Sequence, residues 1–250
     1  MFVGHFGAAF AGKRPAPRVS LGTLIFSFQF ADLLWPILLL LGVEHVRGVP
    51  GLMPTNPYDF YDYPVSHSLA ALAGWGALVG GIHFARRRDP LAAAVLGLGV
   101  VSHWFLDALM HRPDMPLLPK GPYVGLGLWR SVAATAGIEG ALYAGGIALY
   151  LATTRARDRI GTWAFWALVV FLGAGWSLSL GNLQPVEERK LAWGALSMWL
   201  VIPWGWWIDR HREVPAKAYV SDSGYPDSGL GCATSRISSK TISSDAVGPR

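Results

Sequence analysis

Six apolar runs constrain this chain more than any other feature of its sequence. Each has roughly the 20 residues that a helix, rising 1.5 Å per residue, needs to cross about 30 Å of hydrocarbon. The runs are roughly Leu21–Val43, His67–Ala85, Pro90–Met110, Gly127–Thr153, Gly161–Leu180 and Leu191–Ile208. Most are apolar around the whole helix, as is typical of lipid-facing spans. The sequence therefore predicts an all-α, polytopic transmembrane helical bundle of about six spans.

The composition agrees with a membrane protein. Charged residues make up only 15% of the chain, whereas a typical soluble domain has about 25%. The hydrophobic share of 52% excludes a disordered chain. Twelve Trp residues are also present, and this side chain favours membrane interfaces. The single cysteine, Cys232, excludes an intramolecular disulfide and a Cys-x-x-Cys metal site.

The placement of basic residues predicts how the spans are oriented. Six crossings place alternate connections on opposite sides of the membrane. The connections on one side contain twelve Lys and Arg residues, and those on the other side contain six. The positive-inside rule then puts both termini in the cytoplasm. This distribution accounts for the formal net charge of +5 without a nucleic-acid partner, so none is expected. The bilayer itself is the expected partner.

We expect three parts along the chain. Residues 1–20 form an interfacial or re-entrant segment, because the apolar stretch Met1–Gly12 is too short to span and its basic residues follow it, unlike a cleavable signal. Residues 21–212 form the transmembrane domain. Residues 213–250 are expected to be a disordered polar tail, because they are Ser-rich and have no apolar period.

Ionisable residues inside the runs are candidate functional groups. A charge at the centre of a bilayer costs at least about 2.5–3.5 kcal/mol on insertion scales, so such a residue is a functional hypothesis by default. The first four runs contain these residues and the last two almost none, which predicts that four helices surround a polar site while two form a lipid-facing scaffold. The residues are Asp32, His67, His103, Asp107 and Glu139.

The sharpest local pattern is in the third run. His103, Asp107 and His111 are spaced i, i+4, i+8, so on a helix they lie within an arc of about 80°. An imidazole and a carboxylate one turn apart can bind one cation together, or the carboxylate can orient the imidazole. A plain hydrogen bond between two buried polar groups is the alternative, because His-x-x-x-Asp is a short and common pattern.

The remaining candidates each leave alternatives open. Asp32 has no basic partner in its run, so it binds a cation, pairs with a histidine or is protonated. His67 follows Asp62 across Pro64 at a predicted loop-to-helix corner, with Ser66 as a candidate N-cap, and is a ligand or an interfacial histidine. Glu139 is a ligand, a general base or a helix-packing group.

Taken in order, His5, Asp32, His67-Ser68 and Ser102-His103-x-x-x-Asp107 resemble the inner-membrane-associated metal-dependent hydrolases, a family that includes a LexA-binding member. That family is distantly similar to zinc-dependent phospholipase C and P1-type nucleases. The resemblance covers roughly residues 1–120. This chain departs from the family pattern at two places. It has one acidic residue, Asp32, where the family usually has a pair of acidic residues, and it has Asp62 where the family has a histidine.

The resemblance implies a bacterial inner-membrane enzyme that hydrolyses a phosphoester or another ester, with a lipid-like substrate. It also implies one or more bound divalent metal ions, and the histidine content indicates zinc. The implied ligands are His5, Asp32, Asp62, His67, His103, Asp107 and His111, and the general-base candidates are Asp107 and Glu139. Because His5 starts on the predicted cytoplasmic side, it reaches the site only if Met1–Gly12 inserts into the bundle.

Two other functions fit the same residues. An ion- or proton-coupled transporter would use Asp32, His103, Asp107 and Glu139 as a relay, and would need a helix break near the middle of the membrane, which the segment Asp32–Pro36 offers. A non-catalytic membrane adaptor would use its polar groups only to hold helices together.

Overall fold

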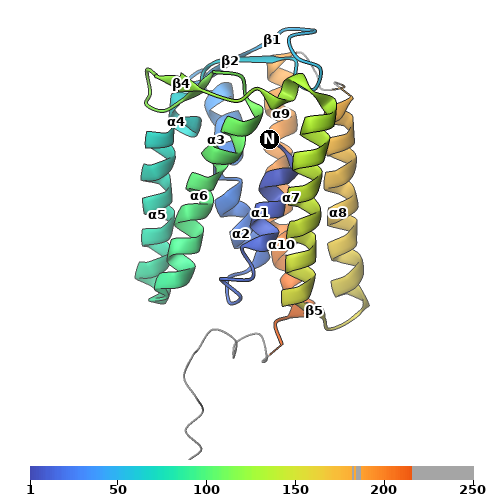
Figure 1. The fold of residues 1–250 in the computed structure, drawn as a ribbon. Helices are drawn as coiled ribbons and strands as arrows, with labels where there is room; N and C mark the ends of the chain where they lie inside the picture. Colours follow the sequence, from blue (N-terminus) through green and yellow to red (C-terminus); the bar gives the residue numbers. More distant parts are fainter. Residues whose placement is uncertain (182, 184–186, 216–250) are drawn as a thin grey trace, which may run out of the picture.

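The computed structural model describes residues 1–181, 183 and 187–215, and the described chain forms a bundle of helices (Figure 1). The predicted tail falls almost wholly outside this range. Its first residue, Glu213, lies in a short strand, β6 (Arg212–Glu213), that pairs with β5 (Arg155–Ala156).

Five helices are long and apolar enough to cross a membrane, and a bent pair makes the sixth candidate span. The single helices are α5 (Leu69–Arg87), α6 (Pro90–Met110), α7 (Val132–Thr153) and α8 (Arg159–Leu180). The fifth span, Glu188–Arg210, joins α9 (Glu188–Leu196), η2 (Ser197–Leu200) and α10 (Val201–Arg210). The prediction of an all-α bundle with about six spans is confirmed.

The first predicted run is broken. The helices α2 (Leu21–Phe28) and α3 (Phe30–Leu40) meet at Gln29 with a bend of 58°. The break therefore precedes Asp32, and Pro36 lies inside α3. This geometry turns Asp32 and the Phe28 carbonyl toward the centre of the bundle, where both contact histidines described below.

Side-chain caps set the starts of most spans. Asp89, Ser131 and Asp158 accept hydrogen bonds from the backbone at the starts of α6, α7 and α8. Ser68, and not Ser66 as we expected, is the N-cap of α5, where its hydroxyl accepts from the Ala71 amide at 3.2 Å. Ser66 lies one turn earlier in the short helix α4 (Pro64–His67). The Ser66 hydroxyl therefore does not cap α5 and is available for other hydrogen bonds.

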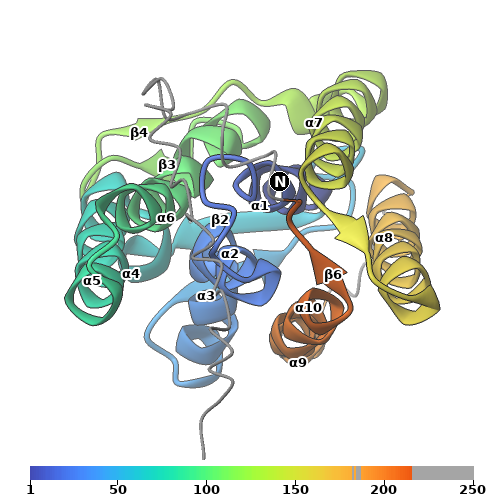
Figure 2. The same ribbon diagram turned by 90° about the horizontal axis from the view of Figure 1, so that it is seen from below.

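The N-terminal helix α1 (Val3–Ala11) is inserted into the bundle. Figure 2 shows α1 and α2 between the α5–α6 pair on one side and α7, α8 and α10 on the other. Helix α1 packs closely on α7 because both carry glycine at the contact: a Cβ on Gly7 would overlap the Leu142 carbonyl, and one on Gly146 would overlap the Gly7 carbonyl. Met1 and His5 are buried as a result.

The two ends of the bundle differ. One end holds the α1–α2, α5–α6 and α7–α8 turns with their arginines, and β5 marks it in Figure 1. The other end is covered by two antiparallel hairpins, β1 (His45–Gly48) with β2 (Tyr58–Asp62) and β3 (Met115–Pro116) with β4 (Tyr123–Val124), and by the turn η1 (Leu128–Arg130). The direction in which the bundle crosses the membrane stays a prediction.

Candidate metal centre

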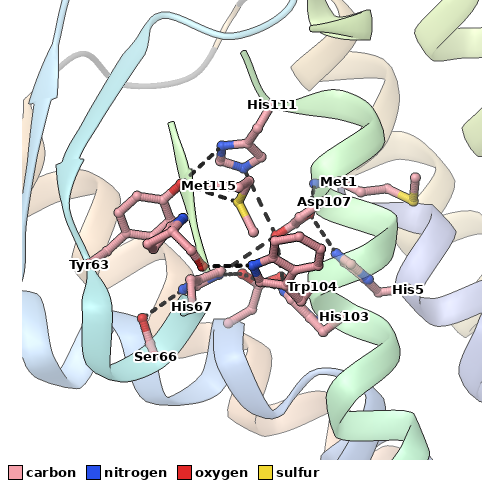
Figure 3. A network of polar contacts seen from close by, with 12 residues as sticks. Met1, His5, Tyr63, Ser66, His67, His103, Trp104, Asp107, His111 and Met115 are labelled. Carbon is pink, nitrogen blue, oxygen red and sulfur yellow. Dashed lines mark hydrogen bonds and ion pairs between the residues drawn. The ribbon is translucent and has the colours of Figure 1, made fainter. Parts of the chain in front are cut away.

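A cluster of imidazole and carboxylate groups lies in the half of the bundle beneath the β1–β2 hairpin (Figure 3). Its members come from four helices: His5 on α1, Asp32 on α3, His67 on α4, and His103 and Asp107 on α6. Two overlapping sets have donor atoms within 4.8 Å of one another, His5–His103–Asp107 and Asp32–His67–His103. Five predicted ligands, separated by up to 102 residues, thus meet at one place.

Asp107 lies at the centre of the cluster, and both of its oxygens are engaged. Oδ1 lies 2.5 Å from the Met1 amino group and 3.0 Å from Nε2 of His5. Oδ2 lies 3.3 Å from Nε2 of His103 and 3.8 Å from Nε2 of His67. The carboxylate is buried, so it depends on these partners for its stability.

Asp32 faces the same two imidazole nitrogens from the opposite helix. Its Oδ1 lies 3.5 Å from Nε2 of His67 and 3.6 Å from Nε2 of His103. The four separations that join the two nitrogens to the two carboxylates therefore run from 3.3 to 3.8 Å. In a tetrahedral zinc site with ligands at about 2.0–2.1 Å, neighbouring ligand atoms are about 3.4 Å apart. These four separations are compatible with such an ion.

The far nitrogens of the two histidines are held in place. Nδ1 of His103 lies 2.9 Å from the Phe28 carbonyl at the α2–α3 break. A carbonyl only accepts, so Nδ1 carries a proton, and in the neutral ring Nε2 presents a lone pair to the cluster. Among the described residues, Nε2 of His103 has no hydrogen-bond partner although it is fully buried. An orphaned basic nitrogen of this kind fits a metal ligand.

His67 is oriented by a relay that the sequence analysis missed. Its Nδ1 lies 2.6 Å from Oγ of Ser66, and that hydroxyl donates to Oε2 of Glu44 at 2.5 Å. The other oxygen of Glu44 accepts from the Val65 and Ser66 amides at the start of α4. The only available signal was the adjacency of Ser66 and His67, because Glu44 lies 22 residues away in an unremarkable connection.

His5 contributes through stacking as well as through Asp107. Its ring lies parallel to that of His103, with centroids 3.6 Å apart and planes within 8°. Its Nδ1 is buried and has no hydrogen-bond partner in the described part of the chain. His5 can join the site only if the N-terminal segment inserts into the bundle, and α1 is inserted in this way.

His111 lies at the edge of the cluster. Its Nε2 is 3.9 Å from Oδ2 of Asp107, while its Nδ1 is 2.9 Å from Oδ1 of Asp114. Tyr63 lies beside it and donates to the Asp114 carbonyl at 3.0 Å. Burial, with the nearby carboxylates, raises the pKa of Tyr63 well above its ordinary value, so this hydroxyl stays a donor. His111, the i+8 residue of the sequence pattern, therefore interacts mainly with Asp114 and Tyr63 and only at longer range with the cluster.

Glu139 and Asp62 lie apart from the donor atoms. Oε2 of Glu139 accepts from the Phe2 amide at 2.8 Å and the Gly4 amide at 3.4 Å, so this side chain binds the start of α1 to α7. Asp62 lies on β2, where its half-exposed carboxylate is 3.1 Å from Nδ1 of His45. The structure does not bring Asp62 to the cluster that it was predicted to join, because the hairpin turns it toward the surface.

A cavity of about 550 Å³ adjoins the cluster. Asp32, His67 and Asp107 line its polar end, with Glu139 and His111 nearby. One further wall residue is Trp35, which lies edge-on to His67 and whose buried Nε1–H has no acceptor among the described residues. The opposite wall comes from α8, α9 and η2. The expectation that the last two spans are only scaffold is therefore wrong, since both line the cavity.

The bundle and its apolar spans define a multi-pass membrane protein. A model of the YdjM inner membrane protein family matches residues 63–184, from the residue before α4 to beyond α8, so the chain is similar to that family over this part and is an inner-membrane protein. No curated protein and no solved structure matches the chain. The family match bears on location, and it does not bear on a chemical activity.

Proposed function

We propose that this protein is a membrane-embedded, metal-dependent hydrolase that acts on a phosphoester or ester of a lipid-like molecule. The observation that carries the proposal is the convergence of two imidazole nitrogens and two carboxylates at 3.3–3.8 Å, beside a cavity. The oriented Nδ1 atoms support it, because ligating histidines commonly donate their other N–H to a carbonyl or a polar side chain.

His67, His103, Asp32 and Asp107 would hold the ion, and zinc is a divalent metal that a set of two imidazoles and two carboxylates suits. When bound, such an ion supplies a water of pKa near 7 and polarises the scissile group. His5 supports the set by stacking on His103.

Three residues of the chain would anchor the site, accept a proton and bind the substrate. Asp107 has both oxygens within the cluster, so it acts as a ligand and an anchor for α1. Glu139 lines the cavity and is the general-base candidate, which takes a proton from water at its carboxylate. The Trp35 N–H is placed to donate to a substrate oxygen, because it is buried in the cavity wall.

Metal analysis of detergent-purified protein tests the proposal. We expect a stoichiometric transition metal in the wild type, its loss in His103→Ala, and hydrolysis of phosphoester or lipid-ester probes that a chelator abolishes and added metal restores. His45→Ala is the matched control, because His45 pairs with Asp62 on the surface. Folded protein that binds no metal would sink the proposal.

One observation favours the transporter as a second candidate. The α2–α3 span is bent by 58° at Gln29, and the buried amide of Gln29 has no hydrogen-bond partner in the described part of the chain. Broken spans with polar groups at the break, such as the side-chain amide of Gln29 here, are typical of ion and substrate sites in transporters. Proton-coupled flux in liposomes that is lost in Asp32→Asn, without any hydrolysis, would support this second function.

A further inference from the structure

The cavity beside the cluster reaches the flank of the bundle. Three of its lining residues are exposed on α8, namely Phe171, Ala174 and Leu178, and two are exposed on the facing segment, Gly194 on α9 and Ser197 on η2. The mouth therefore lies between two membrane-spanning segments. A side opening between spans faces the hydrocarbon of the bilayer and not water.

The two ends of the cavity differ in chemistry. The inner end carries the carboxylates and imidazoles of the cluster, whereas Leu172, Leu191, Met198 and Val201 make the outer part apolar. Small residues leave the space open: a Cβ added to Gly194 would meet no atom within 4 Å. A volume of about 550 Å³ lies within the range of small-molecule sites, about 300–1,000 Å³.

We propose that the apolar part of this cavity is an acyl-chain site, through which a membrane lipid enters sideways and brings its head-group ester or phosphoester to the cluster. The polar end of this assignment rests on the proposed function. The apolar end rests on the lining of α8 and α9 and on the exposure of the mouth. We call this apolar part the acyl arm.

The physics of a bilayer defines what the acyl arm can contribute. A chain that moves from lipid into an apolar cavity gains little hydrophobic free energy, because lipid tails are already as apolar as the cavity wall. The acyl arm therefore admits and positions a chain that the surrounding bilayer supplies in excess, so its occupancy does not depend on contacts at the cluster. Filling the arm should exclude lipids with a long chain and leave a short, water-soluble ester unaffected.

Photolabelling tests the acyl arm directly. The probe is a phospholipid with a diazirine midway along one acyl chain, incorporated into nanodiscs with the full-length protein. We expect labelled peptides from α8 and α9 in the wild type, and at least a fivefold loss of that labelling in Gly194→Trp. Gly173→Trp is the matched control, because a Cβ on Gly173 also meets no atom within 4 Å and this residue does not line the cavity.

The outcomes separate the acyl arm from the hydrolase proposal. Labelling that survives in Gly194→Trp, or that falls equally in Gly173→Trp, overturns the acyl arm. His103→Ala should lose metal while α8 and α9 are still labelled, so a failure of the hydrolase proposal leaves this measurement intact. If hydrolysis is found, Gly194→Trp should lower the ratio of the long-chain rate to the short-chain rate at least fivefold, whereas Gly173→Trp should leave that ratio unchanged.

Discussion

Nε2 of His5 lies 3.0 Å from Oδ1 of Asp107, although 102 residues separate them in the chain. This contact ties the inserted helix α1 to the middle of the bundle and brings the N-terminal segment to the cluster. Asp107 also contacts the other side of the cluster, because its second oxygen faces His67 and His103. The first prediction concerns its charge.

Asp107→Asn keeps the size of the side chain and removes its negative charge. We expect loss of bound metal and a fall in any hydrolytic rate of at least about a hundredfold. Replacing a residue that only orients a metal ligand already lowers affinity by about 10–100-fold, and replacing the ligand itself should have a larger effect. Metal content per protein and initial rates are the measurements. Asp62→Asn is the control, and an equal effect there would mean that Asp62 and not the buried cluster holds the ion.

Ser66→Ala and Ser68→Ala form a matched pair in adjacent turns. Removing the Ser66 hydroxyl breaks the link from Glu44 to His67, so metal affinity should fall about 10–100-fold. Removing the Ser68 hydroxyl loses the N-cap of α5, so stability should fall by about 1 kcal/mol with metal affinity unchanged. Competition with a chelator and thermal unfolding in detergent report the two effects. Equal affinity loss in both variants would contradict the relay.

Trp35→Phe removes the unpartnered N–H and keeps most of the ring. A hydrogen bond to a charged oxygen contributes about 1.5–3 kcal/mol, so we expect kcat/KM for a phosphoester or ester probe to fall about 10–100-fold. Trp176→Phe is the control, because its buried N–H also has no acceptor in the described part of the chain and it does not line the cavity. Unchanged kinetics in Trp35→Phe would rule out this contact.

Orientation in the membrane can be measured with single cysteines in a Cys232→Ser background. Arg87 lies at the basic end of the bundle and Tyr61 on the opposite hairpin, and both are exposed. We expect a membrane-impermeant maleimide to label Tyr61→Cys in intact cells and Arg87→Cys only after the membrane is opened. The reverse pattern would show that the positive-inside assignment is wrong.

The cap of α8 gives a pH-dependent prediction. The hydrogen bond from His211 to Asp158, at 2.7 Å, and that from the Gly161 amide hold the pKa of Asp158 below its ordinary value. A lowered pKa in the folded state stabilises the fold above the unfolded pKa of about 3.9, and this stability is lost as pH falls through the folded value. Asp158→Asn should therefore be less stable than wild type at pH 7, and the difference should be smaller at pH 3, below the unfolded pKa of about 3.9. Thermal unfolding at both pH values measures it, and a constant difference would contradict the linkage.

The sequence by itself determined the spans and part of the site. Hydrophobicity and length act locally, so five of the six runs appear as long helical spans and Pro90–Met110 has the same bounds in both. Helix geometry fixes the i, i+4 relation of His103 and Asp107, which face one cluster in the structure. Both features follow from neighbours in the chain.

Only the tertiary structure decided which distant groups meet. The insertion of α1 depends on the close approach of Gly7 and Gly146, and neither glycine signals its partner in the sequence. Other tertiary contacts turn Asp62 to the surface, link Glu44 to His67 through Ser66, and make α8 and α9 a wall of the cavity, while the insertion of α1 brings His5 to His103. Contacts between segments far apart in the chain depend on how side chains of several helices fill space together, and no local pattern encodes that fit.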